Sequence, residues 1–368
     1  MLTSFLNSGV IGLDIGSSSV KIAALTKNNN KFRLENCDIA IFEKECFNEQ
    51  GEILDFNYVK SIILELINRQ KYKCRNVVMA VPHRMIVSDI VSLPLDMPVD
   101  EQNYQLEVEA NRMLPPSVGA SFDYFLSSGN NATSVSSTQS SSNNMVNTSS
   151  QSHSFNVMAV SKDIVEDRIK LIQENKKLKP IAVDSDAFAA LRNTYYVWQA
   201  EGSLDQVRVL LHLGHSGSYM FVIHNYDIVY QQNLVTNGHQ LTQTIMRYYD
   251  MPFTEAERKK RTLGLPAGYT DDVLVPYLEN TVIDVIQGIQ NFFSTSSLSR
   301  VDGIYISGGH SLIEGLSTQI AKKTHINTQV FNPFLGLLRS AGIDEAALRK
   351  NMPSYTTSIG LALRGFES

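Results

Sequence analysis

Short apolar runs separated by small polar turns dominate the start of the chain. Val10–Ile15 and Val20–Leu25 are predicted strands on either side of the turn Gly-Ser-Ser-Ser, and a third strand is predicted around Phe32–Phe42. The apolar residues between positions 59 and 67 then recur at the spacing of one helix face, with Asn57 as the predicted N-cap. This order of elements predicts a mixed α/β fold that begins with a β-hairpin.

The pattern changes from about position 84. Met85–Leu93 alternates as a strand, and Asp100 is the predicted N-cap of a helix that stops at Pro115. One apolar face of that helix carries Leu106, Ala110 and Met113. Phe122–Leu126 and Phe155–Val160 are predicted to pair as strands. These elements together predict a small subdomain of its own.

A low-complexity segment, Ser127–Ser154, separates the last two strands. Of its 28 residues, 22 are Ser, Thr, Asn or Gln, and none carries a charge. Such a segment buries too little apolar surface to offset the entropy lost on ordering, so we expect a disordered insertion in a hairpin. A surface insertion without a binding role is the simpler interpretation.

Composition narrows the class of protein. Lys and Arg total 32 against 37 for Asp and Glu, which gives a net charge of −5 and argues against broad binding to a nucleic-acid backbone. The apolar runs are too short to cross a bilayer, and the first residues do not resemble a secretory signal. The three cysteines, unevenly spaced, suit a reducing compartment. We therefore expect a cytoplasmic protein.

A second β region begins after a polar break at Glu201–Asp205, and it repeats the first. IGLDIGSSSVKIAAL and VLLHLGHSGSYMFVI share an order: apolar strand, polar residue, apolar residue, glycine, small polar turn, apolar strand. The alignment pairs Asp14 with His212, Gly16 with Gly214, Ser17 with His215, and Lys21 with Tyr219. Two similar hairpins about 200 residues apart predict two similarly built halves that face one another.

These turns have the chemistry of a phosphate site. Backbone N–H groups and hydroxyls in a glycine-serine turn suit phosphate oxygens, Lys21 adds a positive charge, and Asp14 offers oxygen to Mg²⁺ directly or through water. A third candidate element is the strand Gly303–Ser307, which runs into Gly308-Gly309 and a following helix. Each of these glycine turns alone is also typical of an ordinary loop between two elements. The prediction of a phosphate site therefore depends on all three turns occurring in this order.

With these motifs, the sequence resembles the actin-like ATPase superfamily and, within it, the PilM family of type IV pilus assembly proteins. The superfamily motifs are DIGSSSVK (Asp14–Lys21), LHLGHSGS (Leu211–Ser218) and SGGHSLIEGL (Ser307–Leu316). The similarity to the PilM family covers nearly the whole chain and includes LEVEANRMLP, VDSDAFAAL, FTEAERKK, FNPF and IGLALRGFE. The resemblance implies an α/β, actin-like fold of two lobes, each with an RNase H-like mixed sheet, and ATP with Mg²⁺ between them.

The resemblance also implies site residues and subdomains. The first phosphate site would consist of Asp14, Gly16, Ser17, Ser18, Ser19 and Lys21, with Asp14 also serving Mg²⁺. The second would consist of Gly214, Ser216 and Gly217, and the adenosine site of Gly308, Gly309, His310, Glu257 and Lys260. Lobe 1 would comprise 1–83, 180–204 and the returning helix 355–368, with an FtsA-like subdomain 1C at 84–179. Lobe 2 would comprise subdomain 2A at 205–237 and 284–334, and subdomain 2B at 238–283.

The function implied is docking of the short N-terminal cytoplasmic segment of PilN, an inner-membrane protein. We expect that segment along the strand Met85–Leu93 and against the wall formed by Leu106, Ala110 and Met113. The protein would then be recruited to the inner membrane without inserting into it, and it could also form a homo-oligomer or ring. Two alternatives are an active phosphotransferase or ATPase resembling sugar kinases, and an FtsA-like filament.

One departure from the superfamily bears on catalysis. The second phosphate loop usually carries an aspartate where this chain has His212, and neutral imidazole is a poor ligand for Mg²⁺. We therefore expect nucleotide binding with weak or absent hydrolysis, and we assign no catalytic residue. The cluster Arg258–Arg261 is interpreted as a solvated helix face rather than as a nucleic-acid patch.

Overall fold

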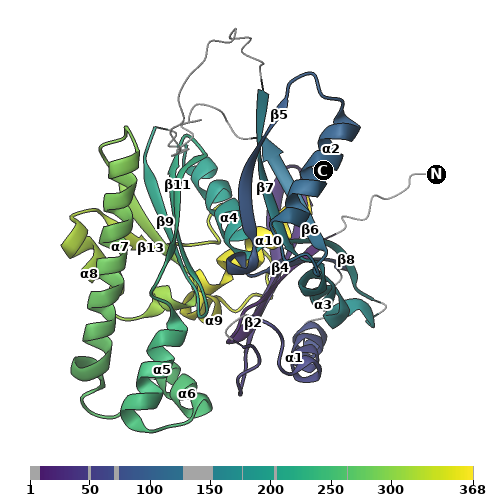
Figure 1. Ribbon diagram of the computed structural model, residues 1–368. Helices are drawn as coiled ribbons and strands as arrows, with labels where there is room; N and C mark the ends of the chain where they lie inside the picture. Colours follow the sequence, from purple (N-terminus) through teal and green to yellow (C-terminus); the bar gives the residue numbers. More distant parts are fainter. Residues whose placement is uncertain are drawn as a thin grey trace. The chain divides into compact units, whose positions relative to one another are not determined.

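The computed structural model describes residues 9–48, 51–69, 74–126, 152–175, 177–202, 205–262 and 264–367 (Figure 1). The chain divides into a larger unit, Met1–Arg84 with Arg168–Ser368, and a smaller unit, Met85–Asp167. The smaller unit lies inside the stretch 84–179 that the sequence assigns to a small subdomain. Most of the Ser/Asn-rich segment falls outside the described residues, but its last three residues, Ser152–Ser154, already belong to a strand.

The first sheet of the larger unit contains six strands in the order β14-β3-β2-β1-β4-β8. They are β1 (Val10–Ile15), β2 (Ser19–Asn28), β3 (Lys31–Ile41), β4 (Asn76–Val81), β8 (Lys179–Ser185) and β14 (Leu338–Arg339). β1, β2 and β3 are antiparallel neighbours, whereas β4 and β8 join in parallel. Every residue of β1 is buried, which is typical of a strand covered on both faces.

The second sheet repeats this topology with five strands in the order β11-β10-β9-β12-β13. They are β9 (Arg208–Leu213), β10 (Ser218–His224), β11 (Asp227–Leu234), β12 (Gly303–Ser307) and β13 (Thr328–Val330). Again three antiparallel strands are followed by two parallel ones. The prediction of two similarly built halves with mixed sheets is confirmed.

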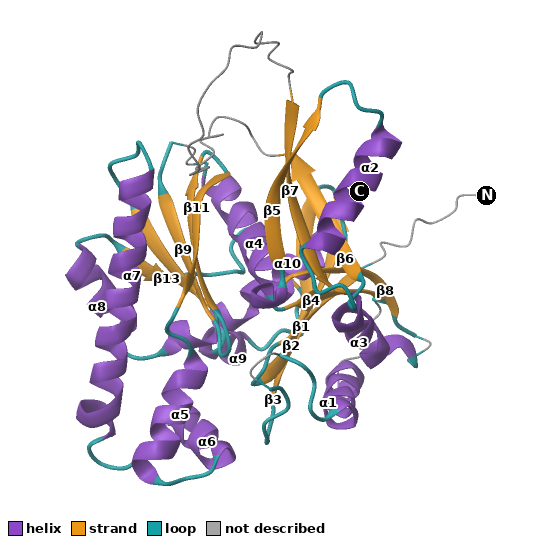
Figure 2. Cartoon of the chain, viewed as in Figure 1, coloured by secondary structure: helices purple, strands orange, loops and turns teal. Residues whose placement is uncertain are grey.

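Helices cover both sheets, as Figure 2 shows. Those of the larger unit are α1 (Phe56–Arg69), α4 (Asp186–Glu201), α5 (Gly238–Tyr249), α6 (Phe253–Thr262), α7 (Val275–Thr295), α8 (Leu316–Thr324), α9 (Glu345–Lys350) and α10 (Thr356–Arg364). α1 packs on one face of the first sheet through Val59, Ile63 and Leu66. α7 and α8 cover one face of the second sheet, and α4 covers the other through Leu191 and Trp198. No helix among the described residues is long and apolar enough to cross a membrane.

The C-terminal helix α10 is the central packing element of the larger unit. Its residues from Thr356 to Leu363 are all buried, and it lies against β1 and α4. The contact with β1 is so close that a Cβ atom at Gly12 would lie 1.8 Å from the carbonyl oxygen of Ser358. On the opposite side, a Cβ atom at Gly360 would lie 1.7 Å from the carbonyl oxygen of Ala189. Only residues without a side chain permit these two backbone contacts.

The smaller unit is an antiparallel sheet in the order β5-β7-β6 that is covered by a helix. Its elements are β5 (Val87–Pro94), α2 (Val99–Arg112), β6 (Ala120–Leu126) and β7 (Ser152–Ser161), and α3 (Lys162–Gln173) leads back into the larger unit. Leu106 and Ala110 of α2 are fully buried against Phe155, Val157 and Ala159 of β7. The core of this unit is therefore the contact between α2 and its own sheet.

Several predicted boundaries differ from the structure in instructive ways. Asp55 rather than Asn57 caps α1, because its carboxylate accepts the N–H of Tyr58 at 3.0 Å. Asp100 does not cap α2; it lies in the first turn, where its charge favours the helix N-terminus, and Pro98 precedes the helix. The predicted strand from Met85 begins two residues later, because His83–Met85 form a 3₁₀ turn.

The close contact of α10 leads to a stability prediction. Gly360→Ala should lower the free energy of unfolding by roughly 2–3 kcal/mol, because the added methyl group must displace the backbone of α4, although alanine is the better helix former. Chemical denaturation measures the change. Gly342→Ala is the matched control, since no atom of the described residues other than Gly342 and its two chain neighbours lies within 4 Å of the place that its Cβ atom would take. Equal stability of the two variants would contradict the packing described here.

Candidate functional site

The turn between β1 and β2 positions the first set of predicted phosphate ligands. Asp14 and Lys21 are partners across the two strands, and their side chains form an ion pair at 3.2 Å. The turn is closed by the N–H of Gly16, which donates to the carbonyl oxygen of Ser19 at 3.1 Å. Asp14 is only 8% exposed, so its charge is held at the end of a buried strand with a matched cation.

The turn between β9 and β10 is built in the same way. His212 and Tyr219 occupy the equivalent cross-strand positions, and their rings stack with centroids 6.5 Å apart and planes 8° apart. The N–H of Gly214 donates to the carbonyl oxygen of Gly217 at 2.9 Å. The equivalence inferred from the sequence is therefore confirmed, with a stacked pair in place of an ion pair.

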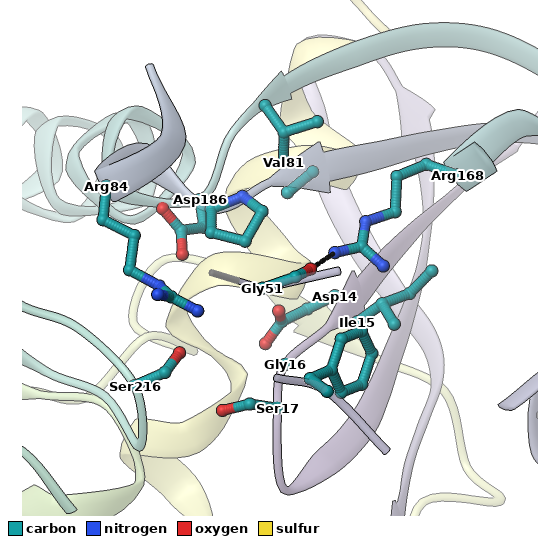
Figure 3. Close-up of a pocket in the computed structure, with 13 residues that line it drawn as sticks. Asp14, Ile15, Gly16, Ser17, Gly51, Val81, Arg84, Arg168, Asp186 and Ser216 are labelled. Carbon is teal, nitrogen blue, oxygen red and sulfur yellow. Dashed lines mark hydrogen bonds between the residues drawn. The ribbon is translucent and has the colours of Figure 1, made fainter. Parts of the chain in front are cut away.

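The two turns meet at a polar pocket of about 30 Å³ (Figure 3). Four residues that the sequence singled out line it: Asp14, Gly16, Ser17 and Ser216. Its other polar side chains were not predicted, and they are Arg84, Arg168 and Asp186. This volume accommodates a water molecule or a bare metal ion and is far too small for a nucleotide.

Asp186 is the functional candidate that the sequence analysis missed. It is the first residue of α4, and its carboxylate accepts the N–H of His83 at 2.7 Å. Burial raises the pKa of Asp186 to about 7, with a further contribution from the charge of Asp14. The available signal was an acid at the junction of a strand and a helix, in the motif VDSD. Asp14 and Asp186 thus present two carboxyl groups to one pocket, as Figure 3 shows.

His212 contributes no charge to this site. It is buried, and its Nδ1 atom lies 2.9 Å from the hydroxyl of Ser307, at the end of β12. Burial lowers the pKa of His212 to about 4, against the opposing charge of Asp14. The imidazole is consequently neutral at physiological pH and does not replace a carboxylate as a ligand for Mg²⁺.

A second buried cluster adjoins the second turn and contains two predicted adenosine residues, Glu257 and Lys260. They are ion-paired with each other, and the carboxylate of Glu257 also pairs with Arg261 at 3.2 Å and lies 3.5 Å from Nδ1 of His215. Burial opposes ionisation of Glu257, but these neighbouring cations outweigh it and hold its pKa well below the ordinary value. Burial lowers the pKa of Lys260, and Glu257 opposes that shift. Both residues therefore make their polar contacts with other side chains of the protein.

The prediction of a solvated Arg258–Arg261 face is wrong for Lys260, whereas Arg258 and Arg261 are exposed. Lys260 is largely enclosed, and its ammonium also donates to the hydroxyl of Thr242 at 2.6 Å. Arg261 donates to the hydroxyl of Ser18 at 3.1 Å, which connects α6 with the first phosphate turn. The local sequence around Arg261 could not predict this hydrogen bond, because Ser18 lies 243 residues away in the sequence.

The third predicted element, Gly308-Gly309-His310, directly follows β12, which lies between β9 and β13 in the second sheet. Gly308 adopts φ 86°, and a Cβ atom there would lie 2.3 Å from the carbonyl oxygen of Leu213. His310 is buried, its ring centroid is 6.1 Å from that of His215, and burial lowers its pKa well below the ordinary value. The structure therefore brings His310 beside the second turn, but none of these three residues lines the 30 Å³ pocket.

The donor set suits phosphate with Mg²⁺. No group of three His, Cys, Asp or Glu side chains among the described residues could hold a metal alone, so phosphate oxygens and water would have to complete the coordination that Asp14 begins. Within the described part of the chain, four buried polar atoms near the turns have no hydrogen-bond partner: Ser17 Oγ, His215 Nδ1, Ser218 Oγ and His310 Nδ1. A buried polar atom without a hydrogen-bond partner lowers the free energy of unfolding unless a ligand or water supplies that partner. The residues present fit the group that the resemblance implies.

The smaller unit corrects the predicted partner groove. Leu106 and Ala110 cannot form the wall of a groove, because both are fully buried in the core beneath α2. The outer part of α2 instead lines a hollow of about 670 Å³ with Tyr104, Glu107, Val108, Asn111, Arg112, Leu114 and Pro116. β5 lies at the edge of its sheet and exposes Ile90 to 60%.

Comparison with known proteins identifies the family. The family described as type IV pilus assembly protein PilM matches residues 12–366. The chain belongs to the PilM family. A solved structure described as a PilM-PilN type IV pilus biogenesis complex has a similar fold, with a TM-score of 0.79, 21% identity, and coverage of 98% of this chain and 99% of that one.

A second solved structure extends the likeness of fold beyond this family. The ethanolamine utilization protein EutJ from Carboxydothermus hydrogenoformans matches with a TM-score of 0.53 at 13% identity, over 96% of this chain and 88% of that one. The PilM member thus has the actin-like fold of two lobes that its sequence predicts. The finer division of lobe 2 into 2A and 2B stays a prediction.

Proposed function

We propose that this PilM family member binds an adenine nucleotide with Mg²⁺ between its two hairpin turns and docks the N-terminal cytoplasmic segment of PilN during type IV pilus assembly. The observation that carries the proposal is the convergence of both turns on one polar pocket beside Asp14. Membership of the PilM family supports the role in pilus assembly and recruitment to the inner-membrane face.

Nucleotide entry would require the two turns to move apart. The pocket holds about 30 Å³, and the hydrogen bond from Arg261 to Ser18 connects α6 with the first turn. A nucleotide would take the place of that hydrogen bond and would supply acceptors to Ser17, His215 and His310. Lys21 would neutralise phosphate charge, while Asp14 would hold Mg²⁺ directly or through water.

Nucleotide binding is tested by Asp14→Ala and Lys21→Ala, each of which should weaken ATP binding in the presence of Mg²⁺ by about tenfold or more, because charge-assisted contacts to phosphate are lost. Isothermal titration calorimetry measures the affinity, and thermal unfolding checks the fold. Lys31→Ala, at the exposed start of β3, is the control. Wild-type affinity in both site variants would place the nucleotide elsewhere.

For PilN, we expect a peptide of roughly ten residues to add along the edge of β5 with micromolar affinity, about −8 kcal/mol. The test compares Ile90→Glu, on β5, with Tyr104→Glu in the hollow beside α2, by fluorescence anisotropy. Ile90→Glu should abolish binding, and the control Ile283→Glu, an exposed residue of α7, should not.

Loss of binding in Tyr104→Glu alone would move the PilN site to the hollow beside α2. Wild-type affinity in both variants would contradict docking on this unit. Leu106→Glu is unsuitable for this test, because a charge in the buried core of the unit would unfold it.

Slow ATP hydrolysis is a second candidate function, favoured by the unpredicted carboxyl group of Asp186. The carboxylate of Asp186 lines this pocket, where it would orient and deprotonate an attacking water. Neutral His212 is a poor ligand for Mg²⁺, so the metal would be held less firmly than by the aspartate usual in the superfamily. This would make hydrolysis measurable but slow in the isolated protein.

Asp186 acts as a base only after it loses its proton, so single-turnover hydrolysis should accelerate as the pH rises through about 7. Asp186→Asn should abolish both the reaction and this pH dependence. Asp184→Asn is the control, because Asp184 pairs with Arg192 at 2.6 Å and does not line the pocket. An unchanged rate in Asp186→Asn would exclude this role.

A further inference from the structure

Both positions where the chain passes between the two units lie at the candidate nucleotide pocket. Arg84 is the last residue of the first segment of the larger unit, and Arg168 is the first residue of its second segment. Both arginines line the 30 Å³ pocket with Asp14, Ser17 and Ser216. Residues of the larger unit that adjoin both of its connections to the smaller unit therefore line this pocket.

The two arginines have different surroundings. Arg168 is 2% exposed, donates to the carbonyl oxygen of Gly51 at 3.4 Å and lies over the ring of Phe47 at 5.2 Å. Figure 3 shows Arg84 on the opposite side of the pocket, with its guanidinium extended toward Ser216 and near Asp186. Arg168 is thus a packed structural residue, whereas Arg84 faces the hydroxyls of the phosphate turns.

The backbone at Arg84 is held by both halves of the larger unit. The N–H of Arg84 donates to the hydroxyl of Tyr219, on β10, at 3.2 Å. The preceding N–H, of His83, donates to the carboxylate of Asp186 at 2.7 Å. Movement of the second turn relative to α4 would consequently pull on the turn His83–Met85, and β5 begins three residues after Arg84.

We propose that Arg84 binds the terminal phosphate of the nucleotide and communicates its presence to the smaller unit through β5. This inference rests on the proposed nucleotide function and adds to it a residue that distinguishes ATP from ADP. Guanidinium groups bind phosphate oxygens with two parallel hydrogen bonds, and lysine provides only a point charge. The competing role for Arg84 is that of a structural counter-charge to Asp186, which would give no preference for the third phosphate.

The experiment compares ATP and ADP binding, each with Mg²⁺, in wild type, Arg84→Ala and Arg84→Lys by isothermal titration calorimetry. We expect Arg84→Ala to lose about tenfold in affinity for ATP and less than about twofold for ADP, and Arg84→Lys to fall between. Arg75→Ala is the matched control, because Arg75 is exposed and immediately precedes the opposite end of β4.

The outcomes separate the two proposals. If wild type binds neither nucleotide, the proposed function fails, and this inference fails with it. If wild type binds ATP but Arg84→Ala keeps the wild-type ratio of ATP to ADP affinity, only the role of Arg84 is overturned. If Arg84→Ala does not fold, Arg84→Lys still tests the role of Arg84. If Arg84 is only a structural counter-charge to Asp186, the lysine variant should keep the wild-type ratio of ATP to ADP affinity.

Communication to the smaller unit has its own measurement. Amide hydrogen exchange in Val87–Pro94 should slow severalfold when ATP binds to wild type, because the turn before β5 becomes fixed. ADP should produce a smaller change, and Arg84→Ala should give equal exchange with both nucleotides. ATP-dependent slowing of β5 that persists in Arg84→Ala would overturn the assigned path.

Discussion

The close backbone contacts of α10 hold the larger unit together. Gly12 brings this helix against β1, and Gly360 brings it against α4, at distances that no side chain permits. α4 in turn packs on the second sheet through Leu191 and Trp198. The strand end that carries Asp14 and the helix end that carries Asp186 are thereby placed on either side of one pocket. The candidate site depends on a helix that contributes no side chain to it.

The two turns differ in the charge of their cross-strand pairs. On the first turn Asp14 forms an ion pair with Lys21, and Asp14 also lines the pocket. On the second turn the equivalent pair is His212 and Tyr219, which are buried, stacked and neutral. Because the second half supplies no carboxylate, the additional acid comes from α4 instead, and Asp186 retains its proton to about pH 7.

The sequence alone determined the parts of this protein that depend on local pattern and internal similarity. The hairpin repeat was visible because both turns need the same order of apolar and small residues, and the strand register then pairs the residues that the alignment had paired. The family followed from motifs spread along nearly the whole chain. Turn residues such as Ser17 and Ser216 were found for the same reason, since their position in a turn is fixed locally.

Only the tertiary structure decided which faces and charges are used. The sequence of an apolar helix face is the same whether that face binds a partner or packs on its own sheet. In this protein the face that carries Leu106 and Ala110 packs on β7. Arg261 and Asp186 look like ordinary surface charges in the sequence, but their partners, Ser18 and the N–H of His83, lie 243 and 103 residues away. Burial sets the ionisation of Asp186, long-range contact sets the partner of Arg261, and neither property is encoded in a local pattern.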